Sequence, residues 1–149
     1  MYQWLVRRLV LSAYRAVTAG DHEAALRACA QDVVQAVPGQ SPLGGTRRSV
    51  AGYRAWFERV RRLFPSLKLD VHAVAVSGMP WNTTVAVAWT DTVTAPDGRE
   101  FRNDGMHLAT MRWGRLTSIR YYWDTELVAA ACAHVAALGV DEAAEAPLA

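Results

Sequence analysis

The sequence predicts an α+β fold in which helices pack on one face of a strongly curved, mostly antiparallel β-sheet, with a cavity between them. Two observations support this. The first half of the chain places apolar residues at helical spacing, and the second half alternates apolar and polar residues in long runs separated by tight turns. Helices followed by strands, with one apolar sheet face to cover, are typical of α+β domains.

Four helices are expected, at about residues 3–19, 21–30, 49–65 and 124–138. Residues that cap helices begin the last three of them: Asp21, Ser49, and Asp124 or Thr125. The first helix carries three arginines among its apolar residues, so we expect it to belong to the fold rather than to be a secretion signal.

Strands are expected at about 33–37, 67–77, 85–94, 99–111 and 115–123, of which the last four form the main sheet. The stretch between the first strand and the third helix is too rich in Gly and Pro for regular structure, so we expect a loop at the rim of the cavity.

The turn at 95–99 offers Pro, Asp and Gly in the order that a short hairpin loop needs, and pairs Asp91 with Asn103 and Val87 with His107. The next turn contains Trp113 and Gly114. A bulky Trp113 resists positive φ, so we expect a three-residue loop closed by Gly114.

The loop at Gly114 sets His107 opposite Ile119 and Gly105 opposite Tyr121. With both registers, one sheet face is mainly apolar and carries polar groups near one end, as a pocket wall would. Its residues are Val85, Val87, Trp89, Asp91, Val93, Phe101, Asn103, His107, Met111, Ile119, Tyr121 and Trp123.

The opposite sheet face is too apolar to be purely solvated, with Met106, Leu108 and Tyr122 on it, and we expect a homodimer through this face. The 149 residues fit one domain over 1–140 followed by a flexible tail at 141–149.

Composition excludes several classes of partner and cofactor. The net charge of +2 is too small for a nucleic-acid partner, and no apolar run is long enough for a membrane span. The four histidines lie on different expected elements, so we expect no metal and no cofactor. Cys29 and Cys132 have no disulfide or zinc spacing, and we expect reduced thiols in a cytoplasmic protein.

Five short motifs resemble the nuclear-transport-factor-2-like (NTF2-like) superfamily and, within it, the SnoaL-like polyketide cyclases, relatives of the ketosteroid isomerases. They are 19–21 (AGD), 31–34 (QDVV), 105–108 (GMHL), 112–116 (RWGRL) and 123–124 (WD). The resemblance covers nearly the whole chain. It implies the NTF2-like or cystatin-like fold, a cone of helices over a bent sheet around a deep apolar pocket.

The resemblance also implies a chemistry. Family members of the cyclase type use a pocket His and an acid/base Asp to close a ring by intramolecular aldol reaction, without metal or cofactor. His107 matches that His, whereas the Asp position falls on Tyr121, and Asp124 matches a later acidic position. The position of the ketosteroid isomerase base holds Val37, so that chemistry is not implied.

Three residues are candidate catalysts. His107 has a reference pKa that suits proton transfer near neutrality, and burial beside Trp89 would raise the pKa of Asp91 unless Asn103 holds it ionised. Tyr121 is a candidate donor to a developing oxyanion, in place of the family Asp. The alternatives are a buried structural His107, an Asp91 exposed at the sheet end, and a Tyr121 that only lines the pocket.

Seven further residues are expected to contact the substrate, by lining the pocket or by orienting a ligand carbonyl, although each could also be an ordinary core or cross-strand residue: Asn103, Trp89, Tyr14, Tyr53, Trp56, Met111 and Trp123.

Three functions remain open at this point. The first is a cofactor-independent acid/base enzyme, of cyclase or isomerase type, acting on a small, mostly apolar carbonyl or polyketide-like compound. The second is a non-catalytic protein that binds a small apolar molecule in the same pocket. The third is a dimeric interaction module with a vestigial cavity.

Overall fold

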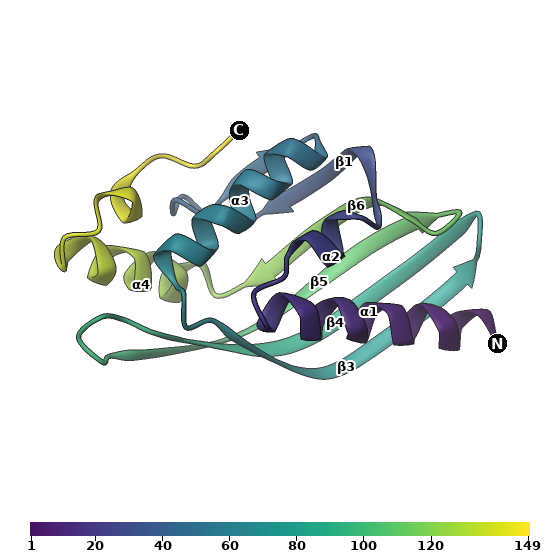
Figure 1. The fold of residues 1–149 in the computed structure, drawn as a ribbon, viewed down its shortest axis with the longest axis horizontal. Coiled ribbons are helices and arrows are strands. Elements are labelled where there is room, and N and C mark those ends of the chain that lie inside the picture. The colour runs from purple at the N-terminus through teal and green to yellow at the C-terminus, as the bar shows by residue number, and fades with distance from the viewer.

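The computed structural model describes all 149 residues and confirms the α+β class (Figure 1). The helices are α1 (Tyr2–Thr18), α2 (Glu23–Leu26), α3 (Val50–Leu63) and α4 (Thr125–Ala137), followed by a 3₁₀ turn, η1 (Asp141–Ala144). The six strands are β1 (Cys29–Val37), β2 (Gly45–Arg47), β3 (Lys68–Met79), β4 (Asn82–Thr94), β5 (Glu100–Arg112) and β6 (Arg115–Trp123).

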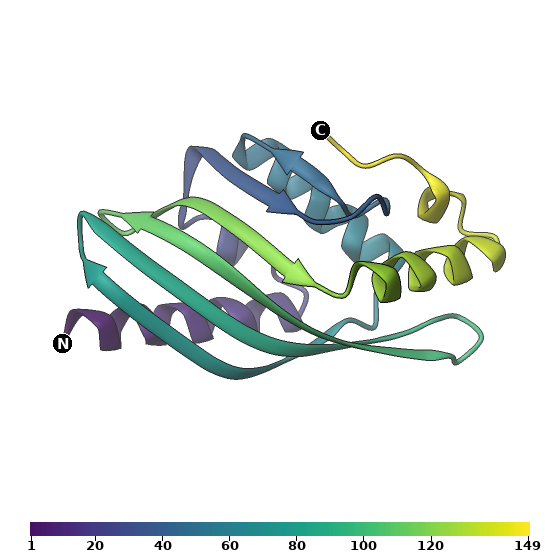
Figure 2. The same ribbon diagram turned by 180° about the vertical axis from the view of Figure 1, so that it is seen from behind.

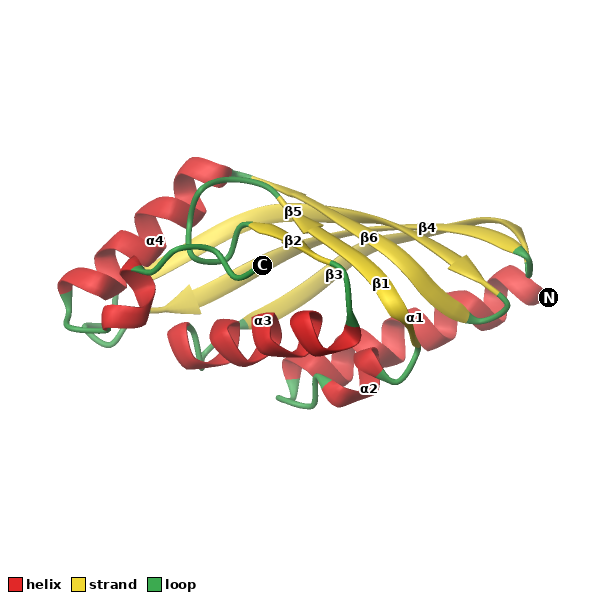
Figure 3. Cartoon of the chain, turned by 90° about the horizontal axis from the view of Figure 1, so that it is seen from above, coloured by secondary structure: helices red, strands yellow, loops and turns green.

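The six strands form one mixed sheet in the order β2-β1-β6-β5-β4-β3. Only β1 and β6 pair in parallel, so the sheet is mostly antiparallel, as expected. Helices α1 to α3 lie on one side of it, and α4 continues from β6 beyond its end (Figure 3). From behind, the strands lie in front of the helices, which leaves that sheet face uncovered (Figure 2). The core lies between the helices and the sheet.

The β4–β5 register agrees with the prediction: Asp91 pairs with Asn103 and Val87 with His107. The β5–β6 register was wrong. The turn has only two residues, because Trp113 takes a φ of 50° and Gly114 a φ of 76°, as both residues of a type I′ turn do. The strain at Trp113 is offset by tertiary contacts, since its backbone N–H donates to the Pro80 carbonyl at 2.6 Å.

A β-bulge at Thr117 then adds a second one-residue change, so that His107 lies directly opposite Tyr121 instead of Ile119. The two changes together shift the pairing by two residues. Because side chains alternate with a period of two, the residues of β6 from Ser118 onward keep their predicted face. Before the bulge the shift is only one residue, so Leu116 pairs with Met111 and lines the cavity, on the face that the prediction gave to Arg115 and Thr117.

Three boundaries near the amino terminus differ from the prediction. The second helix ends at Leu26 rather than near residue 30, and Cys29 lies in a strand rather than in a helix. β1 begins early because β6 lies beside it, with the Leu116 N–H donating to the Ala28 carbonyl at 2.8 Å. β2 forms at Gly45–Arg47 by pairing with β1, in place of the end of the expected loop.

The composition predicts a frayed tail at 141–149, but the structure packs residues 141–146 against α3. The guanidinium of the buried Arg59 donates to the Glu142 carboxylate at 3.2 Å, the Glu145 carboxylate at 2.7 Å and the Ala146 carbonyl at 2.8 Å. The neighbouring Arg62, which is half exposed, also binds Glu142, at 2.7 Å. One buried arginine therefore joins α3 to the end of the chain.

Both cysteines are buried and unpaired. None of the helices combines the length and the apolar character that crossing a bilayer requires.

Replacing Arg59 by Met should lower the free energy of unfolding by about 2–4 kcal/mol, because the Pro42 and Ala146 carbonyls and the partly buried Glu142 carboxylate lose their donor. Arg62→Met is the matched control on the same helix and the same partner Glu142, and should cost below about 1 kcal/mol because that pair is solvated. Urea unfolding followed by circular dichroism measures both. Equal losses for the two variants would contradict the role of Arg59 in holding residues 141–146 against α3.

Candidate active site

A cavity of about 390 Å³ lies between the helices and the inner face of the sheet. Hydrophobic residues make up 29 of the 34 that line it. All ten predicted site residues are among them: Tyr14, Tyr53, Trp56, Trp89, Asp91, Asn103, His107, Met111, Tyr121 and Trp123. The structure therefore places these residues in one cavity of a size that suits a small molecule, while their roles stay predictions.

His107, on β5, is fixed by a residue of the first helix. Its Nδ1 lies 2.6 Å from the hydroxyl oxygen of Tyr14, and the two rings stack with centroids 5.7 Å apart. Burial lowers the pKa of His107 to about 4, so the imidazole is neutral at pH 7. No protein group bonds its Nε2, and if Tyr14 donates to Nδ1, then Nε2 carries the proton and offers it to a ligand.

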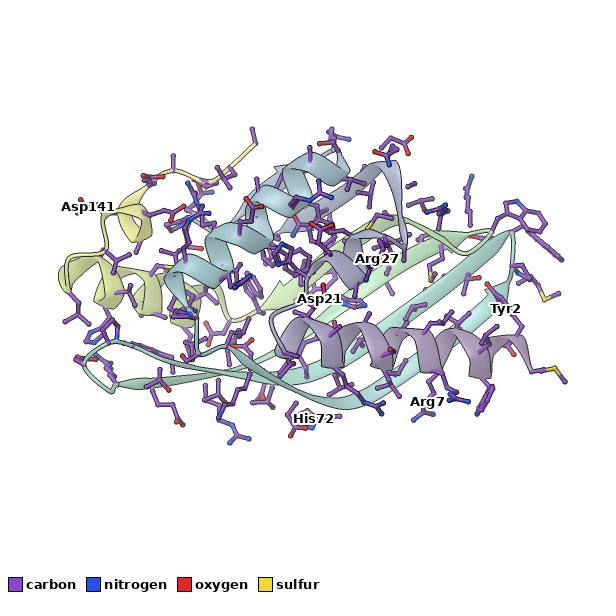
Figure 4. The ribbon with its side chains drawn as sticks, viewed as in Figure 1. Tyr2, Arg7, Asp21, Arg27, His72 and Asp141 are labelled. Atoms are coloured by element: carbon purple, nitrogen blue, oxygen red, sulfur yellow. The ribbon has the colours of Figure 1, made fainter.

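Of the other histidines, none lines the cavity. His72, for example, lies on the edge strand β3 (Figure 4) and its Nε2 is 2.6 Å from the Thr90 hydroxyl. No group of three or more metal-binding side chains occurs in the structure.

Asp91 is held at the wall by two neutral donors. The indole N–H of Trp89 donates to Oδ2 at 3.2 Å, and the Asn103 amide donates to the same oxygen at 3.5 Å. The Asn103 carbonyl in turn accepts from the Asp124 N–H at 3.4 Å, which orients the amide toward Asp91. Burial raises the pKa of Asp91 to about 6, although these two donors oppose the rise.

Trp89 reaches Asp91 because β5 has no side chain opposite it. Gly105 pairs with Trp89, and a Cβ at Gly105 would lie 3.0 Å from the indole ring. The ring therefore lies between the Asp91 carboxylate and His107, with its centroid 5.7 Å from the imidazole.

Tyr121, on β6, faces His107 across the β5–β6 pair and shares a 2.7 Å hydrogen bond with the hydroxyl of Tyr53 on α3. Burial raises the pKa of both phenols, so both keep their protons at neutral pH. A phenol that has a proton and a partner to orient it is suited to donate to a ligand oxygen.

Sequence reasoning missed two polar side chains on the same sheet face, Gln35 and Arg47, which are fully buried. Gln35 could have been noticed, because it occupies an inward position of an apolar strand. Arg47 gave no comparable signal, because its strand was not predicted.

Asp91 and His107 make opposite contributions to the dependence of stability on pH. Between about pH 4 and 6 Asp91 is protonated in the folded protein and ionised in the unfolded chain. The contribution of Asp91 to the free energy of unfolding therefore falls as pH rises. His107, with a folded pKa of about 4 against an unfolded value near 6.5, contributes more as pH rises over that range.

Asp91→Asn and His107→Gln should therefore shift stability in opposite directions between pH 4 and 6.5. The unfolding free energy of the variant minus that of the wild type should increase with pH for Asp91→Asn and decrease with pH for His107→Gln. Each change should be on the order of 1–2 kcal/mol, allowing for the partial exposure of Asp91. Urea titrations at several pH values measure it, and a flat difference for Asp91→Asn would mean that this carboxyl titrates normally.

Three solved structures show what the fold resembles. An NTF2-like protein of unknown function from Burkholderia pseudomallei matches with a TM-score of 0.70 and 25% identity, over 80% of this chain and 91% of its own. TerC, co-crystallised with polyporic acid, matches with a TM-score of 0.68 and 26% identity, over 80% and 91%. IdmH from Streptomyces antibioticus, described as a candidate polyketide cyclase, has a TM-score of 0.69 over 85% and 97%, but its 20% identity shows the fold alone.

A comparison with curated proteins found no match. The family model of the SnoaL-like domain matches residues 10–119, a segment that holds Tyr14, Asp91, Asn103 and His107. This match covers well over half of the chain, and the neighbours share its NTF2-like architecture. The chain therefore belongs to the SnoaL-like family and has the NTF2-like fold.

Proposed function

We propose that the protein is a cofactor-independent acid/base enzyme acting on a small, mostly apolar carbonyl compound, of the polyketide-like kind that the SnoaL-like family implies. One observation carries the proposal. The same apolar cavity holds a carboxyl whose pKa is raised to about 6, at Asp91, and two neutral groups able to donate a hydrogen bond, at His107 and Tyr121. A base whose pKa lies near the working pH suits proton abstraction.

In the proposed reaction, the substrate carbonyl oxygen accepts hydrogen bonds from Tyr121 and from Nε2 of His107. The Asp91 carboxylate removes a proton from the carbon next to that carbonyl, so that a C–H bond breaks, an O–H bond forms and the electron pair moves to the oxygen as an enolate. Tyr14 and Tyr53 hold the two donors in place.

The enolate has two outcomes that need no cofactor. It attacks a second carbonyl of the same molecule, forming a C–C bond, and the new alkoxide takes the proton back from Asp91. Alternatively, Asp91 returns the proton to another carbon and the substrate is isomerised. In both cases Asn103 and Trp89 stabilise the ionised carboxylate, and Tyr121 takes the place of the family Asp.

The cavity bears on the two alternatives to an enzyme. A vestigial cavity is disfavoured, because about 390 Å³ lies within the range of small-molecule sites. A non-catalytic binding protein would use the same apolar lining but would not need a carboxyl buried beside it. TerC, a structural neighbour with 26% identity, was co-crystallised with polyporic acid, which supports a small organic ligand for this chain without naming it.

Exchange of carbon-bound protons with heavy water tests the reaction before the substrate is known. A panel of aromatic and polyketide-like ketones is incubated with the protein in heavy water, and deuterium next to the carbonyl is followed by mass spectrometry. Asp91→Asn should slow the exchange by about 10²–10⁴-fold with less than about threefold change in affinity. Met111→Leu, a lining control, should mainly change affinity.

Exchange that is no faster with the wild type than without protein would assign the cavity to binding alone, and exchange that is equally fast in the wild type and in Asp91→Asn would exclude Asp91 as the base.

We also propose a homodimer through the outer sheet face, where Met106, Leu108 and Tyr122 are 39%, 44% and 45% exposed. Leu108→Arg should raise the dissociation constant at least tenfold by placing a charge in an apolar interface. Leu138→Arg is the control, because Leu138 is 42% exposed but lies at the end of α4. Light scattering at tens of micromolar measures both; a monomeric wild type would contradict the dimer.

A further inference from the structure

Two buried polar side chains lie behind Tyr121, on the strands that complete the sheet. Gln35 of β1 is 0% exposed and Arg47 of β2 is 1% exposed, and the two are directly paired across these strands. On its other side Gln35 pairs with Ile119, two residues before Tyr121 on the same face of β6. One row of polar side chains therefore crosses four adjacent strands on the same sheet face. It runs from Arg47 on β2 through Gln35 on β1 and Tyr121 on β6 to His107 on β5.

Arg47 has no acidic partner. Its Nη2 donates to the carbonyls of Leu43, Gly44 and Gly45, at 3.4, 2.6 and 2.9 Å, and its guanidinium lies 5.9 Å from the ring centre of Trp56. Its Nε and Nη1 have no hydrogen-bond partner and it forms no ion pair. Burial lowers the pKa of Arg47 to about 10, which still leaves it charged at pH 7.

Gln35 is unsatisfied as well, since neither its amide nitrogen nor its oxygen makes a hydrogen bond of good geometry. Buried polar groups are normally paired, and a buried cation without a counter-charge is costly. Such a cation is stabilised when a negative charge arrives nearby, and in a water-poor interior the attraction acts over longer distances than in water.

The negative charge would have to arrive on the cavity side of Tyr121. Arg47 and Gln35 do not line the cavity themselves, whereas Tyr121 and Tyr53 do. At the other wall Asp91 would repel an anion. Because Tyr121 and His107 each offer one donor, they suit a single oxygen rather than the two oxygens of a carboxylate.

We propose that Arg47 and Gln35 are positioning residues that make the Tyr121 side of the cavity select a ligand with an acidic enol or phenol hydroxyl, bound as its anion. This deepens the proposed function, and rests on it for the cavity as the substrate site. The substrate class is then an enolisable 1,3-dicarbonyl compound, whose enolate oxygen is the one that Tyr121 and His107 bind in the proposed reaction, rather than a simple ketone. Arg47 acts through the buried row and does not touch the substrate.

The test uses 2-naphthol, which ionises, and naphthalene, which has nearly the same shape and does not. The absorption spectrum of bound 2-naphthol across pH gives its pKa in the complex, and calorimetry gives both affinities. The wild type should bind 2-naphthol with its pKa lowered from the value in solution. Arg47→Met should raise the bound pKa by about one unit or more, which is a tenfold loss of preference for the anion, with naphthalene affinity unchanged.

Two variants check that the charge is responsible. Arg47→Lys keeps the charge and should restore most of the lowered pKa, although it loses carbonyl contacts. Arg62→Met removes an arginine from the outer side of α3 and should leave the bound pKa as in the wild type. If Arg47→Met does not fold, Gln35→Leu replaces it in the test. The pKa of bound 2-naphthol should then be higher in Gln35→Leu than in the wild type.

The outcomes separate the two proposals. A wild type that binds naphthalene and 2-naphthol equally, with no lowering of the naphthol pKa, would overturn the role of Arg47 and leave the proposed function standing. Equal loss of both ligands in Arg47→Met would assign that residue a structural role only. A wild type that binds neither ligand would overturn the apolar substrate site and the inference with it.

Discussion

The carboxyl, the amide and the imidazole of the cavity depend on the pairing of β4 with β5. This long hairpin fixes which residues face the helices, and its strict alternation brings Asp91, Asn103 and His107 onto one face while it turns their neighbours outward. The gap at Gly105 then admits the Trp89 indole, which donates to the carboxylate and separates it from the imidazole. The arrangement of these groups thus follows from the alternation of side chains along the two strands and from the absence of a side chain at Gly105.

Burial in an apolar cavity raises the pKa of an acid and lowers the pKa of a base, and both shifts occur on the inner face of this sheet. Loss of water favours the neutral form, so it raises the pKa of Asp91 to about 6 and lowers that of His107 to about 4. The result is that the carboxyl, rather than the imidazole, titrates near neutrality. The family His is therefore better suited here to donate a hydrogen bond, and the base of the proposed reaction is an acid residue on the neighbouring strand.

Much of this arrangement was predictable, because it follows from local patterns. Alternation and the Pro-Asp-Gly turn gave the register of Asp91 with Asn103, and the motif around His107 gave the family. The errors lie where distant contacts override local preference. Trp113 accepts a positive φ because Pro80 binds its N–H, and Cys29 joins a strand because β6 provides a partner. Arg47 escaped notice because its strand exists only through pairing with β1.

The parallel pairing of β1 with β6 also has a consequence for how the chain is made. The partners Gln35 and Ile119 are far apart in sequence, and β6 is the last strand to leave the ribosome. Until it does, β1 and β2 have no edge to join, and the apolar faces of α1 and α3 have no complete wall to cover. Contacts of such long range are slow to form and leave apolar surface exposed meanwhile. During synthesis, the growing chain therefore has no enclosed cavity until β6 has emerged, and the residues that will line the cavity first form an exposed apolar surface on which chaperones can act.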